Sequence, residues 1–268
     1  MDQKQRVAEF RALHAPGQCL VLPNAWDAAS AKIAEVAGAK AVATSSAAVA
    51  WSHGYADGDV MPRDVVMAAT REAIRVVNLP VTVDSEGGYS SDPARVADHV
   101  QALIEIGVAG INLEDGKSPP DLLAAKIRAI KAAVAAKGAD IFINARSDVY
   151  LQNLVPDDQK LTEIMRRVKV YTDAGADGIF APFANALSHI REIVAATSLP
   201  VNLLVNKAAP DIAALKSAGV RRISIGAIGG RAAYGQFVQG VKALLNEGKT
   251  DTLFATSGEC PDFNKAFG

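Results

Sequence analysis

The segment IGVAGINLED, residues 106–115, contains the pattern that decides the fold. A helical stretch ends in Ile-Gly, two residues follow, and an apolar run then closes on polar side chains. Gly107 suits the left-handed position just past a helix end, and the apolar run is typical of a strand buried on both faces of a parallel sheet. The same pattern recurs at residues 36–46, 174–183 and 217–226. The chain therefore repeats a unit in which a strand follows a helix.

This pattern predicts eight strands, and apolar stripes with helical spacing lie between them. Eight strand and helix units in about 250 residues match a (β/α)8 barrel of the TIM type, whereas a doubly wound sheet more often has five or six strands. We therefore expect one α/β barrel domain over residues 1–268, with an extra N-terminal helix and a C-terminal helical arm over residues 245–268. The predicted strands are residues 19–24, 41–46, 81–86, 110–115, 141–147, 178–183, 201–206 and 222–226.

Composition and charge exclude several classes of protein. The 268 residues include 28 basic and 29 acidic side chains, and this balance argues against a nucleic-acid partner. The longest uncharged stretch, residues 41–56, is too short and too polar for a membrane span. The charged start MDQKQRVAEFR lacks the apolar region of a signal peptide, so we expect a cytoplasmic protein. Cys19 and Cys260 lie far apart and indicate neither a disulfide framework nor a zinc site.

Acidic side chains follow two neighbouring predicted strands. Asp84 and Glu86 lie at the end of the third strand, and Glu114 lies at the end of the fourth. Since active sites of such barrels lie at the carboxyl ends of the strands, we expect the three carboxylates to surround one point. Oxygen ligands without His or Cys suit Mg²⁺, or Mn²⁺, better than zinc. Taken singly, each acid could equally cap a helix or pair with a surface lysine.

Other strand ends provide candidates for substrate binding. Arg146, after the fifth strand, offers a planar fork for a carboxylate or phosphonate and a charge that would stabilise an anionic oxygen. An ion pair with Glu114 alone is the alternative. Asn202 lies on the seventh strand. Asp57, on a long loop after the second strand, either faces the metal pocket or serves as a turn residue.

Six segments together resemble the isocitrate lyase and phosphoenolpyruvate mutase superfamily. The resemblance implies a modified (β/α)8 barrel that binds Mg²⁺ with a small 2-oxo or 2-hydroxy carboxylic acid. It also implies a homotetramer in which the terminal helix packs on a neighbouring subunit, and apolar residues in the C-terminal arm favour an oligomer independently. The six segments are LPNAWDAASA (22–31), VDSEGGYS (83–90), GINLEDG (110–116), INARSD (143–148), AGADGIFAP (174–182) and ISIGAIGGR (223–231).

The resemblance also implies roles for individual residues in the metal site. Asp84 matches the principal metal ligand, and Glu86 and Glu114 match side chains that hold metal-bound water. Asp57 matches a further carboxylate of the metal site. The expected catalytic residues are therefore Asp57, Glu114 and Arg146.

On the substrate side, Arg146 matches the substrate-binding arginine of the superfamily. Ser45, Ser46 and Ala47 fall where the superfamily has a turn that holds the substrate carboxylate. Serine at position 46 replaces the usual glycine of that turn. Asn202 completes the expected substrate contacts.

The segment after the fourth strand, EDGKSPPDLLAAK (114–126), departs from the superfamily. Isocitrate and methylisocitrate lyases carry Lys-Lys-Cys-Gly-His there, with the cysteine as acid or base, but this chain offers only Lys117. The longer loop of the phosphonomutases, which bears lysine and asparagine, is missing too. We therefore expect a reaction that needs little proton handling.

The expected activity is that of a Mg²⁺-dependent lyase. It would cleave a carbon–carbon bond of a small 2-oxo or 2-hydroxy acid through a metal-stabilised enolate, in the manner of an oxaloacetate decarboxylase or a methylisocitrate lyase. One alternative is an enzyme acting on carbon–phosphorus bonds, such as a phosphonomutase or a phosphonopyruvate hydrolase. A second alternative is a barrel that binds a keto acid without catalysis.

Overall fold

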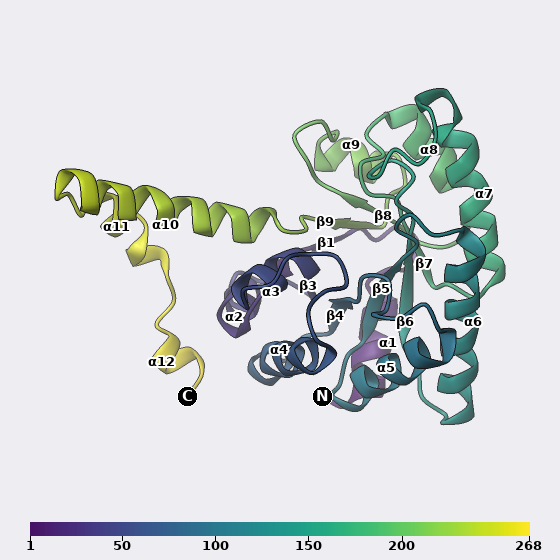
Figure 1. Cartoon of the computed structure of the whole chain (residues 1–268), viewed down its shortest axis with the longest axis horizontal. Coiled ribbons are helices and arrows are strands. Elements are labelled where there is room, and N and C mark those ends of the chain that lie inside the picture. Colours follow the sequence, from purple (N-terminus) through teal and green to yellow (C-terminus); the bar gives the residue numbers. More distant parts are fainter.

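Nine parallel strands form a nearly closed ring in the computed structural model, which describes all residues from 1 to 268. Each of the eight predicted strands overlaps an observed strand, and the first overlaps two, so the predicted barrel is confirmed (Figure 1). The strands are β1 (Leu20–Leu22), β2 (Asn24–Ala25), β3 (Val42–Thr44), β4 (Val81–Asp84), β5 (Gly110–Glu114), β6 (Phe142–Arg146), β7 (Gly178–Phe180), β8 (Val201–Leu204) and β9 (Arg222–Ser224).

The first strand is split, and its two halves join the two ends of the ring. Pro23, which has no N–H to donate, separates β1 from β2; β1 pairs with β9, and β2 pairs with β3. Asn24 fastens this seam, because its Nδ2 donates to the carbonyl of Thr44 at 2.9 Å and its Oδ1 accepts from the amides of Ile225 and Gly226 at 2.9 and 2.8 Å.

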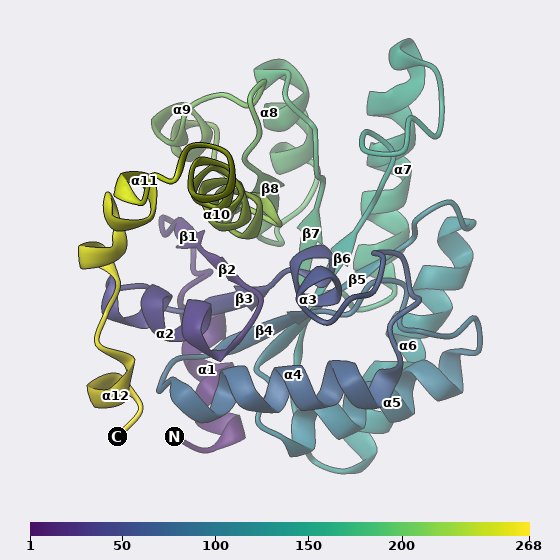
Figure 2. The same ribbon diagram turned by 60° about the vertical axis from the view of Figure 1, so that its left-hand side comes forward.

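Helices surround the ring (Figure 2). The largest apolar cluster lies between β4–β9 and the helices α5–α9. Gly107 has the predicted left-handed backbone, with φ of 97°, and so do the corresponding glycines of the other three repeats. The helices are α1 (Gln3–Ala12), α2 (Ala28–Val36), α3 (Ser46–Ser52), α4 (Arg63–Val76), α5 (Pro93–Glu105), α6 (Pro120–Ala136), α7 (Lys160–Asp173), α8 (Leu187–Ala195), α9 (Ile212–Ser217), α10 (Ile228–Glu247), α11 (Asp251–Phe254) and α12 (Phe263–Ala266), with 3₁₀ turns at Asp157–Gln159 and Ser257–Glu259.

Part of the segment predicted as a long loop after the second strand is helical. Helix α3 occupies residues 46–52, and Ser45 precedes it as the N-cap. The sequence SAAVAWS supplies small side chains that favour a helix, and Ala48, Val49 and Ala50 are buried. The remaining loop, residues 53–62, is therefore shorter than expected.

Helix α1 closes the amino-terminal end of the barrel, as the predicted extra helix. Phe10 is fully buried there, with its ring centroid 5.4 Å from that of Phe142 and 4.7 Å from that of His14. A separate apolar cluster joins Val7 and Phe10 of α1 to β1, β3 and Phe142 of β6. The strand ends at the opposite side of the ring are left open for a site.

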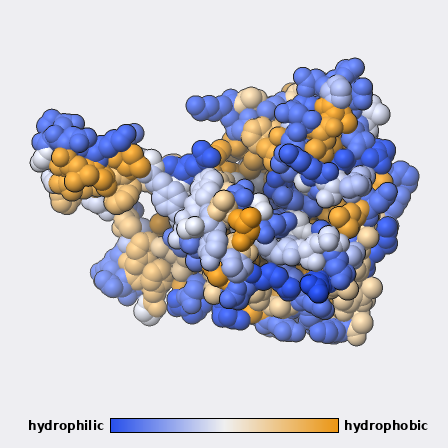
Figure 3. Space-filling view, viewed as in Figure 1, coloured by the Kyte–Doolittle hydropathy of each residue, from blue (hydrophilic) through white to orange (hydrophobic).

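Helix α10 leaves the barrel instead of packing along it. It extends away from the body of the molecule, and α11 folds back against its far end (Figure 1). Apolar side chains are gathered on this projecting part (Figure 3); Phe237 and Leu245 are 64% and 76% exposed. The predicted arm over residues 245–268 thus includes the end of α10 with α11 and α12. None of the helices combines the length and the apolar character required to cross a bilayer.

We expect Phe10→Ala to lower the free energy of unfolding by about 3–5 kcal/mol, because the buried ring would leave a cavity between α1 and the barrel. Urea unfolding followed by circular dichroism measures this loss. Lys4→Ala, on the exposed face of the same helix, is the matched control. Equal stabilities for the two variants would show that α1 does not close the barrel.

Candidate active site

A cavity of about 120 Å³ opens at the carboxyl ends of the strands. Asp84 ends β4 and Arg146 ends β6, and both side chains line this cavity. The start of α3 and the loop before α4 complete one wall. The structure thus brings together these residues predicted from the sequence: Ser45, Ser46, Ala47, Asp57, Asp84 and Arg146.

The carboxylate of Asp84 is held from two sides. Its Oδ2 accepts from the backbone amide of Ser46 at 3.2 Å and from the Ser46 hydroxyl at 2.8 Å. Its Oδ1 accepts from Nδ2 of Asn112 on β5 at 3.4 Å. The side chain is therefore oriented at the floor of the cavity before any ligand binds.

Glu86 lies just past the end of β4 and supports the loop after α3. Its Oε2 accepts from the amides of Gly58, at 2.9 Å, and Asp59, and its Oε1 accepts from the Tyr89 hydroxyl at 3.3 Å. Burial raises the pKa of Glu86 to about 7, and repulsion from Asp59 and Asp57 adds to the rise. Glu86 has a φ of 47°, which breaks the strand alternation that predicted its direction.

Asp57 lies on that same loop and faces the cavity. Burial raises its pKa, and the neighbouring Asp84 raises it further. Of the two sequence interpretations, the cavity-facing one is therefore observed, and Glu86 holds the adjoining backbone in place.

Arg146 is fixed between two carboxylates. Its Nε and Nη2 form a bidentate pair with Asp148 at 2.7 and 3.0 Å, and its Nη1 lies 2.5 Å from Oε2 of Glu114. Burial alone would lower the pKa of Arg146, but Glu114 and Asp148 raise it above its ordinary value, so the guanidinium stays charged. Burial raises the pKa of Glu114 well above its usual range, although Arg146 opposes this rise.

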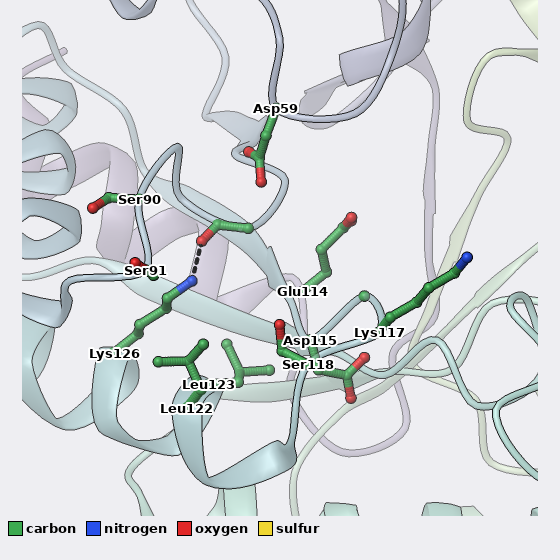
Figure 4. A pocket seen from close by; sticks show the side chains of 12 residues that line it. Asp59, Ser90, Ser91, Glu114, Asp115, Lys117, Ser118, Leu122, Leu123 and Lys126 are labelled. Atoms are coloured by element: carbon green, nitrogen blue, oxygen red, sulfur yellow. Dashed lines mark hydrogen bonds between the residues drawn. The ribbon is translucent and has the colours of Figure 1, made fainter.

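A second pocket, of about 270 Å³, lies beside the central cavity (Figure 4). Glu114 lines this pocket and points to the side where Asp59 lies. Lys126 donates to the carbonyl of Gly87 at 2.6 Å, whereas the side chain of Lys117 extends away from Gly87 and Lys126. Lys117 is thus placed at the rim of the site and outside the central cavity.

The carboxylates do not form the compact ligand set expected from the sequence. No three His, Cys, Asp or Glu side chains lie close enough to ligate one ion together, and only Asp84 of the predicted trio lines the central cavity. Direct ligation of one ion by all three carboxylates is therefore not observed, and the roles of Asp84 as ligand and of Glu86 and Glu114 through metal-bound water stay predictions. The donors still fit Mg²⁺, which keeps several waters and often takes one or two carboxylates from the protein. Desolvation and the charge of Asp84 raise the pKa values of Asp57 and Glu114, which also favours a cation among these acids.

Asn202 does not reach the cavity. It is 1% exposed, and its Nδ2 donates to the carbonyl of Leu203 at 2.8 Å while its Oδ1 accepts from Asn144 at 3.0 Å. β8 continues to Leu204, so the inward-facing position at the rim belongs to Leu204, two residues later. The expected contact of Asn202 with the substrate is therefore not supported by its position.

Asp115 is a buried residue whose importance the sequence did not reveal. Its Oδ1 accepts from the amide of Asp148 at 2.8 Å, and its Oδ2 accepts from Arg167 at 2.6 Å and from the Tyr171 hydroxyl at 2.5 Å. Asp115 thus fixes the backbone of Asp148, and the carboxylate of Asp148 forms the bidentate pair with Arg146. Alternation along β5 is the signal that could have found it, because alternation turns Asp115 toward the helices while Glu114 faces inward.

Comparison with known proteins identifies the family. The model of the phosphoenolpyruvate phosphomutase family matches residues 10–245. The chain belongs to this family. The superfamily indicated by the sequence motifs is thereby confirmed.

Three similar proteins illustrate the range of this phosphomutase family. The protein Rv1998c of Mycobacterium tuberculosis is 38% identical over 82% of each chain. The 2-methylisocitrate lyase of Bacillus subtilis is 28% identical over 76% of this chain and 68% of its own. A solved structure from Burkholderia cenocepacia, described provisionally as a phosphonomutase, is 40% identical, covers 89% of this chain and 99% of its own, and superposes with a TM-score of 0.84.

The raised pKa of Glu86 predicts a distinctive pH dependence of stability in this family member. In EDTA, we expect the wild-type free energy of unfolding to fall relative to that of Glu86→Gln between pH about 4.5 and about 7. A carboxyl that binds its proton more tightly in the folded state stabilises the fold at low pH, and this contribution is lost as pH rises through the folded pKa.

Denaturant unfolding of both proteins across that pH range provides the measurement. Glu9→Gln, on the exposed face of α1, removes the same charge elsewhere and serves as the control. Parallel curves for the wild type and Glu86→Gln would contradict the raised pKa.

Proposed function

We propose that the protein is a Mg²⁺-dependent lyase that cleaves a carbon–carbon bond of a small 2-oxo or 2-hydroxy carboxylic acid through an enolate. The observation that carries this proposal is the placement of Asp84 and Arg146 in one cavity, each held in a fixed orientation. The lyases among its relatives support the reaction class. The size of the cavity suits a small acid.

Asp84 is the proposed direct ligand of Mg²⁺, and Asp57, Glu86 and Glu114 would hold the ion through water. Bound there, the ion would act as a Lewis acid for the carbonyl or hydroxyl oxygen of the substrate. Ser46 and Asn112 orient the carboxylate of Asp84 for this task. Mn²⁺ would fit the same oxygen donors.

Arg146 would bind the substrate and stabilise the charge that develops on it. The pairs with Asp148 and Glu114 fix the plane of the guanidinium at the cavity wall. A fixed positive charge next to an enolate oxygen lowers the barrier, because it needs no reorganisation during the reaction. Ser45, Ser46 and Ala47 would hold the substrate carboxylate at the start of α3.

The connection between β5 and α6 favours a reaction with little proton transfer. It consists only of residues 115–119, and an internal bond from the amide of Ser118 to the carbonyl of Asp115, at 2.8 Å, makes it a tight turn. Asp115 is buried and paired with Arg167 and Tyr171, so Lys117 is the remaining side chain that could transfer a proton, and it lies at the rim. Decarboxylation of an oxaloacetate-like acid needs less of a general acid than cleavage of a methylisocitrate-like one.

An enzyme that acts on carbon–phosphorus bonds is the second candidate. The 40% identical Burkholderia protein favours it, and the guanidinium of Arg146 would bind a phosphonate as well as a carboxylate. A third candidate, a barrel that binds a keto acid without catalysis, is favoured because the carboxylate of Asp115 is taken up by Arg167 and Tyr171, which leaves Lys117 as the remaining acid or base on residues 115–119.

We expect Mg²⁺-dependent turnover of a 2-oxo or 2-hydroxy acid, and a loss of about a hundredfold or more in kcat/KM for Asp84→Ala, because the ion contributes several kcal/mol to charge stabilisation. The assay tests oxaloacetate, methylisocitrate and phosphonopyruvate with Mg²⁺ and then with EDTA. Asp98→Ala, on the exposed face of α5, is the control.

Turnover of phosphonopyruvate alone would favour the carbon–phosphorus candidate. Binding of these acids without turnover would favour the non-catalytic barrel. Activity that is undiminished by EDTA, or by Asp84→Ala, would rule out the proposed role of the metal.

We also propose that the protein is a homo-oligomer, as a homotetramer of the superfamily would be, held together by α10. Since α10 projects, the outer side of β1 stays uncovered, and an apolar groove of about 490 Å³ lies there beside α2. Val21 and Ile33 line this groove and are 42% and 43% exposed. The exposed apolar side chains of α10 would fit such a groove on a second copy.

We expect the double variant Phe237→Asp and Leu245→Asp to dissociate the oligomer, because two charges would enter an apolar contact. Size-exclusion chromatography with light scattering measures the mass. Arg71→Asp, on the exposed side of α4, changes a surface charge without touching α10. A wild type that is already monomeric, or a variant of unchanged mass, would contradict the proposal.

A further inference from the structure

The interior of the barrel contains an arginine without an acidic partner. Arg222 lies on β9, with its side chain directed into the ring, and it is 1% exposed. Only Nη2 has a hydrogen-bond partner, Oδ1 of Asn112, at 3.2 Å, and Nε and Nη1 have none. Below it, the ring of Phe10 lies 5.6 Å from the guanidinium carbon.

This arrangement is costly for the fold. A buried charge without a paired carboxylate loses hydration free energy that its contacts in the interior do not replace. Burial lowers the pKa of Arg222 to about 9, with Asp84 opposing the fall, so the guanidinium is still charged near neutral pH. An apolar side chain would fill the same space beside Phe10 without this penalty. Packing therefore does not account for an arginine at this position.

The bonds of Asn112 connect Arg222 to the floor of the cavity. Its Oδ1 accepts from Arg222 at 3.2 Å and from Nδ2 of Asn144 at 2.9 Å, so two donors fix the oxygen end of the amide. The opposite end then has to present its N–H group to Oδ1 of Asp84, at 3.4 Å. A reversed amide would place its nitrogen against two donors and its oxygen against a carboxylate.

We infer that Arg222 is a positioning residue: by fixing the amide of Asn112, it orients the Asp84 carboxylate for a divalent cation. The inference rests on the proposed metal site and names a further residue on which that site depends. Arg222 touches neither the cavity nor the substrate, and it acts through Asn112 alone.

The affinity for Mn²⁺, measured by isothermal titration calorimetry without substrate, separates three roles of Arg222. A positioning role predicts that Arg222→Met binds Mn²⁺ about tenfold or more weakly, as is typical when a partner of a metal ligand is lost. A role through charge alone predicts tighter binding, because the removed cation repels the metal ion. A purely structural role predicts lower stability with unchanged affinity.

Two variants test the connection through Asn112. Arg222→Lys keeps a charged donor and should recover part of the affinity. Asn112→Leu breaks the connection without removing the charge, so it should weaken binding as Arg222→Met does. In the double variant the two losses should not add, because both remove the same contact.

The matched control is Arg6→Met. Arg6 is also a buried arginine, but it donates to the carbonyls of Leu79 and Val77 at the amino-terminal end of the barrel. Its replacement should lower stability and leave the Mn²⁺ affinity unchanged.

Unchanged or tighter binding by folded Arg222→Met, or an equal loss in Arg6→Met, would overturn the inference. If Arg222→Met does not fold, Asn112→Leu decides, and wild-type affinity in that variant would overturn it. A wild type that binds no Mn²⁺ would instead refute the metal site itself, and so the proposed function.

Discussion

The hydrogen bonds that hold the carboxylate of Asp84 connect the fold to the proposed chemistry. Ser46 contributes a hydroxyl and an amide from the start of α3, and Asn112 contributes an amide from the neighbouring strand. These three donors meet only because β3, β4 and β5 are adjacent in the ring and end at the same level. The pairing of these three strands therefore fixes the geometry of the site.

Charge balance is the second constraint on this site. Asp57, Glu86 and Glu114 lie near Asp84, with Glu86 buried and Glu114 half-buried, and desolvation together with the charge of Asp84 raises the pKa of each of the three. Arg146 offsets part of this charge from the wall of the cavity, and Arg222 lies beneath the floor. A divalent cation would remove the remaining repulsion between the carboxylates. The oxygen donors of the cavity and the raised pKa values of these acids therefore both favour a bound divalent cation.

The fold was predictable from local patterns, whereas the roles of several side chains were not. The positions of strands and helices depend on the spacing of apolar residues. The repeated unit around Gly107, a helical stretch followed by a glycine and an apolar run, shows this spacing directly. The strand ends also placed Asp84 and Arg146 correctly. Glu86 was misplaced because a left-handed residue interrupts the alternation, and Asn202 was misplaced because β8 runs two residues further. Asp115 and Arg222 act through partners that are distant in the sequence, so local patterns could at most show which way Asp115 points and not what either residue binds.

Diffraction from crystals grown with Mn²⁺, recorded near the manganese absorption edge, would test the metal site most directly. Coordination by Asp84 predicts an anomalous peak in the central cavity, within direct bonding distance of a carboxylate oxygen of that residue. Waters between the ion and Glu86, Glu114 and Asp57 should complete the octahedron. A peak elsewhere, or a cavity without a peak at saturating Mn²⁺, would contradict the assignment of Asp84 as the metal ligand.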